Sequence, residues 1–192
     1  MKKILIGTHN KGKFKEIASL ISKKYKKISP ISLQIKSPKE TGKTFIENSR
    51  LKVKFFSKYV DFPVISDDSG LCIEALNNKP GIYSARLAKK HGSFFKAMKF
   101  ILKKMKNKKN RNATFICCLS LNNRKGKVIC VEGKLKGKIA TKIKGVKGFG
   151  YDPIFIPFKK KITFGQMPKL KKIKMDHRYI AFQKLKKKVK TL

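Results

Sequence analysis

The spacing of apolar residues along the chain alternates between a period of two and a period of three to four, which separates expected strands from expected helices. Residues 2–8 contain a short apolar run that predicts a buried strand. Asn10 follows as a helix N-cap, and apolar side chains then recur at helical spacing at Phe14, Ile17, Ala18 and Ile21. Residues 31–35 alternate like a strand, and residues 44–60 have the pattern of a second helix.

The remainder of the chain predicts further strands and loops and two more helices. The pattern predicts short strands at 63–66 and 71–73 on either side of an acidic turn, followed by a loop at 77–81 and a helix at 93–106. A hairpin of 113–121 and 127–131, joined by 122–126, comes next, and an extended segment follows at 133–143. The last elements are a glycine-rich loop at 145–150, a short strand at 154–156 and a closing helix from about His177 to Val189. Because helices alternate with strands early and a hairpin follows, we expect an α/β fold with a mixed sheet.

The length of 192 residues fits one domain, or one domain with two lobes, around a substantial core. No apolar run approaches the roughly 20 residues of a membrane span, and the apolar stretch at the N-terminus is too short for a signal sequence. Cys72, Cys117, Cys118 and Cys130 lack C-x-x-C spacing and have no histidine nearby, so we expect thiols in a reducing compartment. The sequence therefore predicts a cytoplasmic protein with no membrane association.

The formal net charge of +40 raises the question of a nucleic-acid partner. Only five of the 50 basic residues are Arg, however, and dedicated readers of phosphates and bases rely on the planar fork of Arg. The lysines are dispersed, with short runs at 159–161, 171–172 and 186–188. We therefore expect no specific nucleic-acid recognition, although a basic nucleic-acid-binding protein remains an alternative.

A first candidate for chemistry is the segment 7–13, Gly-Thr-His-Asn-Lys-Gly-Lys, between the first strand and the first helix. Backbone N–H groups at a helix start favour a phosphate, and Lys13 adds positive charge. The spacing matches G-x-x-x-x-G-K, but Phe14 stands where a P-loop requires Ser or Thr to hold magnesium. A P-loop-type phosphotransferase is thus a second alternative.

Three further segments combine polar, aromatic and small residues. Asp67 and Asp68 are adjacent after an apolar run, an arrangement that favours a metal ligand or a general base. The segment 148–153, Gly-Phe-Gly-Tyr-Asp-Pro, offers close backbone approach, aromatic rings and a carboxylate for a base or a ribose. His177 and Arg178, with Lys172 before them, provide donors for a purine carbonyl and a phosphate.

Together these segments resemble the inosine triphosphate pyrophosphatase family, with the Maf-like proteins as more distant relatives. The resemblance runs in order through IGTHNKGKFKEI (6–17), ETGKTFIENSRLK (40–52), ISDDSGLCIEAL (65–76), PGIYSARLA (80–88), GFGYDPIF (148–155) and DHR (176–178). It covers nearly the whole chain.

The resemblance implies a role for each matching residue. Asp68 matches the catalytic proton acceptor and a metal ligand, and Glu40 matches a second ligand for Mg²⁺. The residues implied in substrate binding are Thr8, His9, Asn10, Lys11, Gly12, Lys13, Ser69, Phe149, Gly150, Tyr151, Asp152, Lys172, His177 and Arg178.

The resemblance also implies a fold and an activity. We expect one two-lobed α/β pyrophosphatase domain over 1–192, with a long twisted mixed β-sheet flanked by helices and a central active-site cleft, assembled as a homodimer. The implied reaction is Mg²⁺-dependent hydrolysis of deaminated purine nucleoside triphosphates, such as those of inosine and xanthosine, to the monophosphate and pyrophosphate. A Maf-like pyrophosphatase, which cleaves the same bond on other bases, is a third alternative.

Overall fold

The computed structural model describes residues 1–124 and 127–189, which form two compact units. The first unit takes its described residues from Met1–Asp68, Cys117–Gly133 and Arg178–Leu192. The second comprises Ser69–Ile116 and Lys134–His177. The chain crosses from one unit to the other within strands at 68–69, 116–117 and 133–134, and within the last helix at 177–178.

The described residues form one seven-stranded sheet in the order β2–β1–β3–β5–β6–β7, and β4 pairs with β3 off this path. β1 runs parallel to β2 and to β3, whereas β3–β4 and β6–β7 are antiparallel. The sheet is therefore mixed, and the predicted α/β class is confirmed. The strands are β1 (Lys2–Ile6), β2 (Tyr25–Ile28), β3 (Val64–Ile73), β4 (Lys79–Pro80), β5 (Asn112–Asn122), β6 (Ile129–Ile139) and β7 (Phe155–Pro157).

Helices accompany the strands of each unit. They are α1 (Lys11–Leu20), α2 (Phe45–Phe56), α3 (Ser84–Lys90), α4 (Phe94–Lys104), α5 (Lys169–Ile173) and α6 (His177–Lys188), with short 3₁₀ turns η1 (Ile31–Leu33), η2 (Glu74–Leu76), η3 (Gly81–Tyr83) and η4 (Asp152–Ile154). Among the described residues, no helix is long and apolar enough to cross a membrane.

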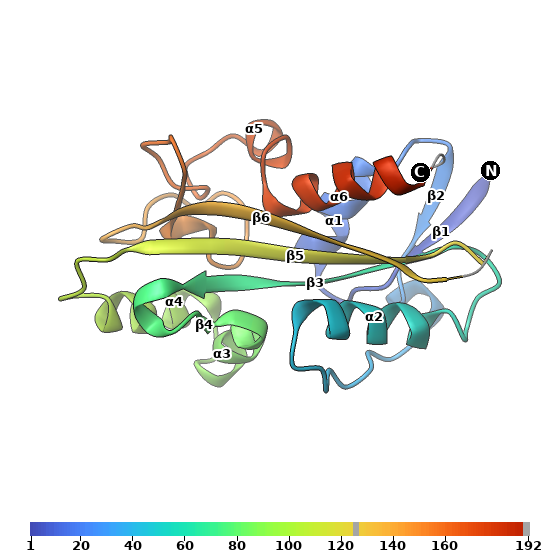
Figure 1. Cartoon of the computed structure of the whole chain (residues 1–192), viewed down its shortest axis with the longest axis horizontal. Helices are drawn as coiled ribbons and strands as arrows, with labels where there is room; N and C mark the ends of the chain where they lie inside the picture. The colour runs from blue at the N-terminus through green and yellow to red at the C-terminus, as the bar shows by residue number, and fades with distance from the viewer. Residues whose placement is uncertain (125–126, 190–192) are drawn as a thin grey trace. The chain divides into compact units, whose positions relative to one another are not determined.

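In the first unit, α1 and α6 lie on one face of the strands and α2 lies on the other (Figure 1). Each face has its own core because the strand side chains alternate between the two faces. One core joins Ile4, Ile6, Ile17, Ile65, Leu119, Phe182 and Leu185, and the other joins Leu5, Ile35, Val53, Phe56 and Val64.

In the second unit, α3 and α4 lie on one face of the strands and α5 on the other (Figure 1). The buried residues form one core that includes Leu71, Ile73, Ala97, Met98, Ile101, Phe115, Phe155 and Phe164. Phe115 and Phe155 contact at 4.4 Å between ring centroids, which fixes β5 against β7.

The helix starts follow the capping residues in the sequence. Asn10, Thr44 and Ser93 each accept a hydrogen bond from a backbone N–H in the first turn of α1, α2 and α4, respectively. The predicted starts of these three helices are therefore confirmed. α2 ends at Phe56, earlier than the predicted 60, because Ser57 closes it and donates its hydroxyl to the Val53 carbonyl at 2.7 Å.

The predicted strand at 31–35 is wrong. Pro30 begins a turn, and its carbonyl accepts hydrogen bonds from the N–H groups of Leu33 and Ile35 at 3.2 and 2.9 Å. Ile31 and Leu33 are exposed, so their alternation does not mark a buried sheet face. β2 is formed instead by Tyr25–Ile28, which pairs with β1.

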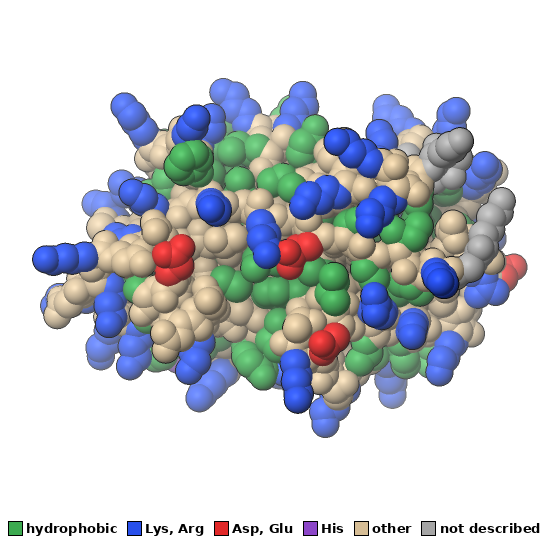
Figure 2. All heavy atoms as spheres, in the orientation of Figure 1, with side chains coloured by type: hydrophobic (Ala, Val, Ile, Leu, Met, Phe, Trp, Pro, Cys, Tyr) green, Lys and Arg blue, Asp and Glu red, His purple; other side chains and the backbone are tan. Residues whose placement is uncertain are grey.

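The acidic turn predicted at Asp67–Asp68 is also wrong, because β3 runs without interruption from Val64 to Ile73. The predicted hairpin of β5 and β6 and the closing helix are confirmed. Lys125 and Gly126 of the predicted hairpin loop lie outside the described residues. The face in Figure 2 shows Lys and Arg side chains spread over the surface, not gathered in one patch.

Candidate active site

In the first unit, the segment Thr8–Lys13 joins β1 to α1. The Asn10 Oδ1 accepts a hydrogen bond from the Lys13 N–H at 3.0 Å, and the Asn10 N–H donates to the Thr8 Oγ1 at 3.2 Å. The amides of the first turn of α1 and the positive end of the helix therefore face this loop. This local geometry suits an anion such as a phosphate.

The loop is held from behind by close packing. A Cβ on Gly7 would overlap the Ser66 hydroxyl and the Phe56 ring, so glycine lets the end of β1 lie against its neighbours. The Nε2 of His9 lies 2.9 Å from the Ile35 carbonyl oxygen, which points the imidazole toward the protein. His9 thus anchors the loop in this structure.

Asp67 is fully buried in β3 and faces two cations of the first unit. Its Oδ2 lies 3.2 Å from the Lys13 Nζ and 3.6 Å from an Arg178 nitrogen. Burial by itself raises the pKa of Asp67, but Lys13, Arg178 and Lys52 more than compensate and hold it at about 2. The carboxylate is therefore ionised and ties the segment Thr8–Lys13 to β3.

Asp68, the next residue, has different partners because neighbouring residues of a strand point to opposite faces. Its Oδ1 lies 3.5 Å from the Lys52 Nζ. Burial raises the pKa of Asp68, and the attraction of Lys52 and Lys13 opposes this shift without cancelling it. The two adjacent carboxylates are thus held in unlike environments, one as a fixed anion and one with increased proton affinity.

Lys52 connects Asp68 with Glu40. Its Nζ donates to the Glu40 Oε1 at 2.6 Å, and the side chain is buried on α2. Burial lowers the pKa of Lys52, but Asp68, Asp67 and Glu40 outweigh burial and raise it. A permanent ammonium group therefore stands where the two carboxylates converge.

Asn48, one helical turn before Lys52, holds the segment that carries Glu40. Its Oδ1 accepts a hydrogen bond from the Gly42 N–H at 2.8 Å, and its side chain is completely buried. A Cβ on Gly42 would lie 2.7 Å from this oxygen, so the contact requires glycine. Two side chains of one face of α2 thus fix Glu40, one through the backbone and one through the carboxylate.

Arg178 lies at the start of α6 with its guanidinium buried in the first unit. One terminal nitrogen donates to the Glu16 Oε2 at 2.9 Å, and the other lies near Asp67. Glu16 is itself buried on α1. The predicted contact of Arg178 with a purine stays a prediction, and in this structure the guanidinium lies beside the carboxylates of Glu16 and Asp67.

The second unit contains the predicted glycine-rich loop. The Asp152 Oδ2 accepts hydrogen bonds from the Phe149 N–H at 2.8 Å and from the Lys172 Nζ at 2.6 Å. The Lys172 Nζ lies 4.7 Å from the centroid of the Phe149 ring. Gly148 has a φ of +76°, and a Cβ there would overlap the Asp152 carboxylate. The loop therefore closes around one buried ion pair.

Tyr151 and His177 have structural contacts within the second unit. The Tyr151 hydroxyl donates to the Ser84 carbonyl at 2.8 Å, and burial raises the pKa of this phenol. The His177 ring stacks on Phe115 with centroids 4.7 Å apart. Both side chains are buried, whereas Phe149, Gly150 and Ser69 are half-buried.

Known proteins resemble this chain over nearly its whole length. The model of the Ham1 family matches residues 4–188. The chain belongs to the Ham1 family. Among curated proteins, it is 41% identical over 190 residues to the dITP/XTP pyrophosphatase of Dictyoglomus thermophilum, covering 95% of this chain and 92% of that protein. It is 38% identical to the dITP/XTP pyrophosphatase of Caulobacter vibrioides, with 96% of each chain covered.

Similar solved structures give the same result. The Staphylococcus aureus Ham1 protein superposes with a TM-score of 0.87 at 35% identity, covering 98% of each chain. A nucleoside-triphosphatase, dITP/XTP pyrophosphatase, from Mycobacterium abscessus has a TM-score of 0.71 at 31% identity, covering 88% of this chain and 91% of that one. The resemblance inferred from the sequence motifs is therefore confirmed.

In this Ham1 family member, Glu40 and Asp68 bring carboxylate oxygens to one place in the first unit, and their role as Mg²⁺ ligands stays a prediction. One oxygen of each carboxylate lies near the same ammonium group, at 2.6 and 3.5 Å from the Lys52 Nζ, so the two converge on one positive centre. Mg²⁺ is usually held by one or two carboxylates together with substrate phosphates. In residues 1–124 and 127–189, no group of three or more His, Cys, Asp or Glu is placed to hold a metal.

The sequence interpretation missed Lys52, Asn48 and Glu16. The detectable signal was a polar residue on an apolar helix face, since Asn48 and Lys52 share the buried side of α2 with Val53 and Phe56. Glu16 is likewise a charged residue at a buried position, next to the buried Ile17 on α1. The structure groups Thr8–Lys13, Glu40, Asp68 and Arg178 in the first unit, and Ser69, Phe149, Gly150, Tyr151, Asp152, Lys172 and His177 in the second.

Proposed function

We propose that this Ham1 family member hydrolyses deaminated purine nucleoside triphosphates, such as those of inosine and xanthosine, to the monophosphate and pyrophosphate. The observation that carries the proposal is the arrangement around β3. Asp67 forms an ion pair with Lys13 of the loop Thr8–Lys13, and Asp68 forms an ion pair with Lys52. The printed names of the relatives, dITP/XTP pyrophosphatases, support the same substrate class.

The loop Thr8–Lys13 binds substrate phosphates in this proposal. The N–H groups at the start of α1 donate to phosphate oxygens, and the Lys13 ammonium neutralises part of their charge. Asp67 keeps Lys13 in place, since the two groups lie 3.2 Å apart. The loop thereby orients the triphosphate without reacting itself.

Asp68 orients a water molecule and accepts its proton as the water attacks the α-phosphorus, and pyrophosphate leaves. The raised proton affinity of this buried carboxylate suits the role of a general base. Such a base contributes roughly 10²–10⁴-fold to the rate. Lys52 holds the carboxylate in position and balances its charge.

Glu40 and Asp68 are the residues that would hold Mg²⁺. When bound, the ion neutralises charge that develops on the phosphate oxygens. Asn48 and Lys52 keep Glu40 in place through Gly42 and through the carboxylate.

Residues of the second unit recognise the base and the sugar in this proposal. Phe149 offers an aromatic surface, and the ion pair of Asp152 and Lys172 beside it offers donors and acceptors. His177, and Arg178 of the first unit, add N–H donors. Hypoxanthine and xanthine present a carbonyl acceptor at C6, whereas adenine presents an amino donor that would leave a donor unpaired.

Product analysis tests the function directly. The purified chain is incubated with inosine triphosphate and Mg²⁺, and pyrophosphate and orthophosphate are both quantified. We expect pyrophosphate and inosine monophosphate in equal amounts. Release of orthophosphate would point to P-loop-type chemistry, which the Phe14 side chain disfavours. No turnover would contradict an enzymatic role, and a preference for other bases would indicate Maf-like specificity.

The assembly and location are part of the same proposal. We infer a homodimer from the resemblance of the motifs, to be tested by sedimentation of the full chain. The four cysteines are free thiols, which supports a reducing, cytoplasmic location. Fractionation of cells that express the tagged full chain tests this location.

A further inference from the structure

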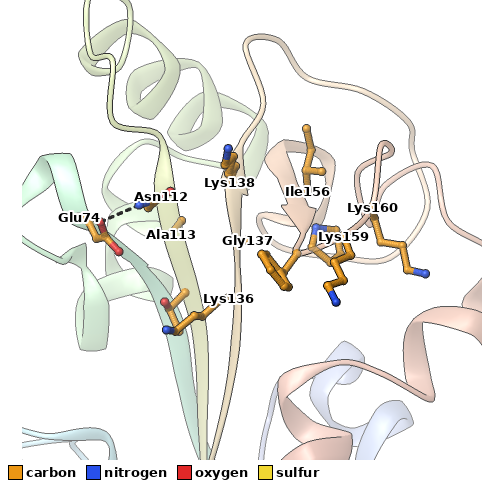
Figure 3. Close-up of a pocket in the computed structure, with 12 residues that line it drawn as sticks. Glu74, Asn112, Ala113, Lys136, Gly137, Lys138, Ile156, Lys159 and Lys160 are labelled. Carbon is orange, nitrogen blue, oxygen red and sulfur yellow. Dashed lines mark hydrogen bonds between the residues drawn. The ribbon is translucent and has the colours of Figure 1, made fainter.

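A hollow in the second unit has no role in the proposed hydrolysis. It has a volume of about 470 Å³ and is lined by β5, β6, β7 and the turn after β7, with Glu74 at one side (Figure 3). Among the described residues, none that belongs to an α-helix lines it. Its size lies within the range of small-molecule sites, which begins at roughly 300 Å³.

The lining residues of β6 and β7 form an ordered array. Lys138 pairs with Ile156 across the two strands, and the Phe158 N–H donates to the Lys136 carbonyl at 2.9 Å. Lys136 and Lys138 flank the buried Gly137, so they project from the same face of β6. Two exposed lysines of β6 therefore stand beside Phe158, the residue that follows β7.

Phe158 is an exposed aromatic residue, with 65% of the residue accessible to solvent. The Lys159 Nζ lies 5.7 Å from the centroid of its ring, and Lys160 follows. Exposed aromatic rings between cations are the arrangement by which proteins stack unpaired bases and neutralise the phosphates that link them. Phe158 belongs to none of the cores that the described residues form, so core packing does not explain its position.

The charges favour a polymer over a single small anion. In Figure 3 the side chains of Lys136, Lys138 and Lys160 point in different directions, so they do not converge on one phosphate group. Among the described residues of the hollow, Glu74 is the only carboxylate, and amides of Asn110 and Asn112 bind it at 3.1 Å each. Glu74 lies on the opposite side from Lys159 and Lys160 (Figure 3).

We propose that this face, defined by Lys136, Lys138, Phe158, Lys159 and Lys160, binds single-stranded nucleic acid without sequence preference. An unpaired base stacks on Phe158, and successive phosphates contact the divergent lysines. A duplex hides its base faces and so cannot use the ring. A second copy of this chain would bring lysines against lysines, which disfavours self-association through this face.

Fluorescence anisotropy of a labelled oligothymidylate of about 16 nucleotides, at low salt, tests the proposal. Phe158→Ala should weaken binding by roughly 5- to 100-fold while leaving the salt dependence unchanged. The pair Lys136→Gln and Lys138→Gln should lower the slope of log K against log salt by about 0.7 for each phosphate that the lysines no longer neutralise. A duplex of equal length should bind more weakly than the single strand.

Matched controls come from α4 in the same unit. Phe95 is also exposed, with the Lys99 Nζ 4.7 Å from its ring centroid, and Lys103 and Lys104 end the helix. Phe95→Ala and the pair Lys103→Gln and Lys104→Gln should change affinity much less. Equal effects of the two sets would show that the net charge alone drives binding and would overturn the proposal. Equal affinity for duplex and single strand would also overturn the proposal. So would a Phe158→Ala variant that binds the oligonucleotide as tightly as the wild type but self-associates less.

Discussion

The Lys52 Nζ donates a hydrogen bond of 2.6 Å to the Glu40 Oε1. The same ammonium lies 3.5 Å from the Asp68 Oδ1, so one buried cation stabilises both carboxylates of the proposed metal site. Asp68 is buried and Glu40 is half-buried. A buried carboxylate without a cation carries a large desolvation cost, which Lys52 offsets for Asp68. Lys52 therefore contributes to the stability of the first unit and to the geometry of its proposed chemistry.

Replacing Lys52 with Met should lower both stability and turnover. The substitution keeps most of the side-chain volume but leaves Glu40 and Asp68 without their cation. We expect a decrease of roughly 3–5 kcal/mol in the free energy of unfolding, measured by urea denaturation. Lys54→Met, at an exposed position of the same helix, is the control and should change stability by less than about 0.5 kcal/mol. Adding Glu40→Gln to Lys52→Met should restore part of the stability, because it removes the carboxylate that has lost its cation. If the two substitutions instead lower the unfolding free energy additively, the interaction between Lys52 and Glu40 is contradicted.

Asp68→Asn should reduce kcat by at least about 10²-fold while the protein still folds. The change removes a charge and a proton acceptor but little volume. Turnover of inosine triphosphate and the circular dichroism spectrum are measured on the same preparation. Asp61→Asn, at an exposed aspartate of the first unit, should behave like the wild type. Retention of more than half of the wild-type kcat in Asp68→Asn would exclude this residue as base or metal ligand.

Asn48→Leu should raise the Mg²⁺ concentration needed for activity while changing the stability of the fold only slightly. The substitution leaves the Gly42 N–H without its acceptor, but it also removes a buried amide nitrogen, Nδ2, for which the described part of the chain offers no hydrogen-bond partner. The two effects oppose each other, so we expect a change in unfolding free energy of about 1 kcal/mol. The Mg²⁺ concentration for half-maximal activity should rise several-fold because Glu40 is less well held. An unchanged Mg²⁺ dependence would show that Asn48 does not position Glu40.

Arg178→Ala should narrow the preference for inosine triphosphate over ATP in kcat/KM. The guanidinium is bound by Glu16 at 2.9 Å, so Glu16→Gln should loosen it and narrow the same ratio to a smaller extent. Both ratios are obtained from pyrophosphate release on the two nucleotides. Equal decreases on both nucleotides in Arg178→Ala would make Arg178 a purely structural residue that supports Asp67 and Glu16.

Short-range chemistry in the sequence is enough to predict where several helices begin and to identify the family. Asn10, Thr44 and Ser93 cap helices through contacts with residues three positions later, and such contacts are visible in the sequence. The ordered motifs likewise identified the family because each is a contiguous segment. The sequence also predicts whether a segment is a strand or a helix wherever one face of that element is apolar.

Packing between distant segments sets which charged residues share a buried environment. Asp67 and Asp68 were expected in a turn, yet β3 continues through them because Lys13, Lys52 and Arg178, distant in sequence, neutralise them. The alternating pattern at 31–35 became η1 because Pro30 starts a turn there. Ion pairs between distant segments depend on how the elements pack, and no local pattern in the sequence records that packing.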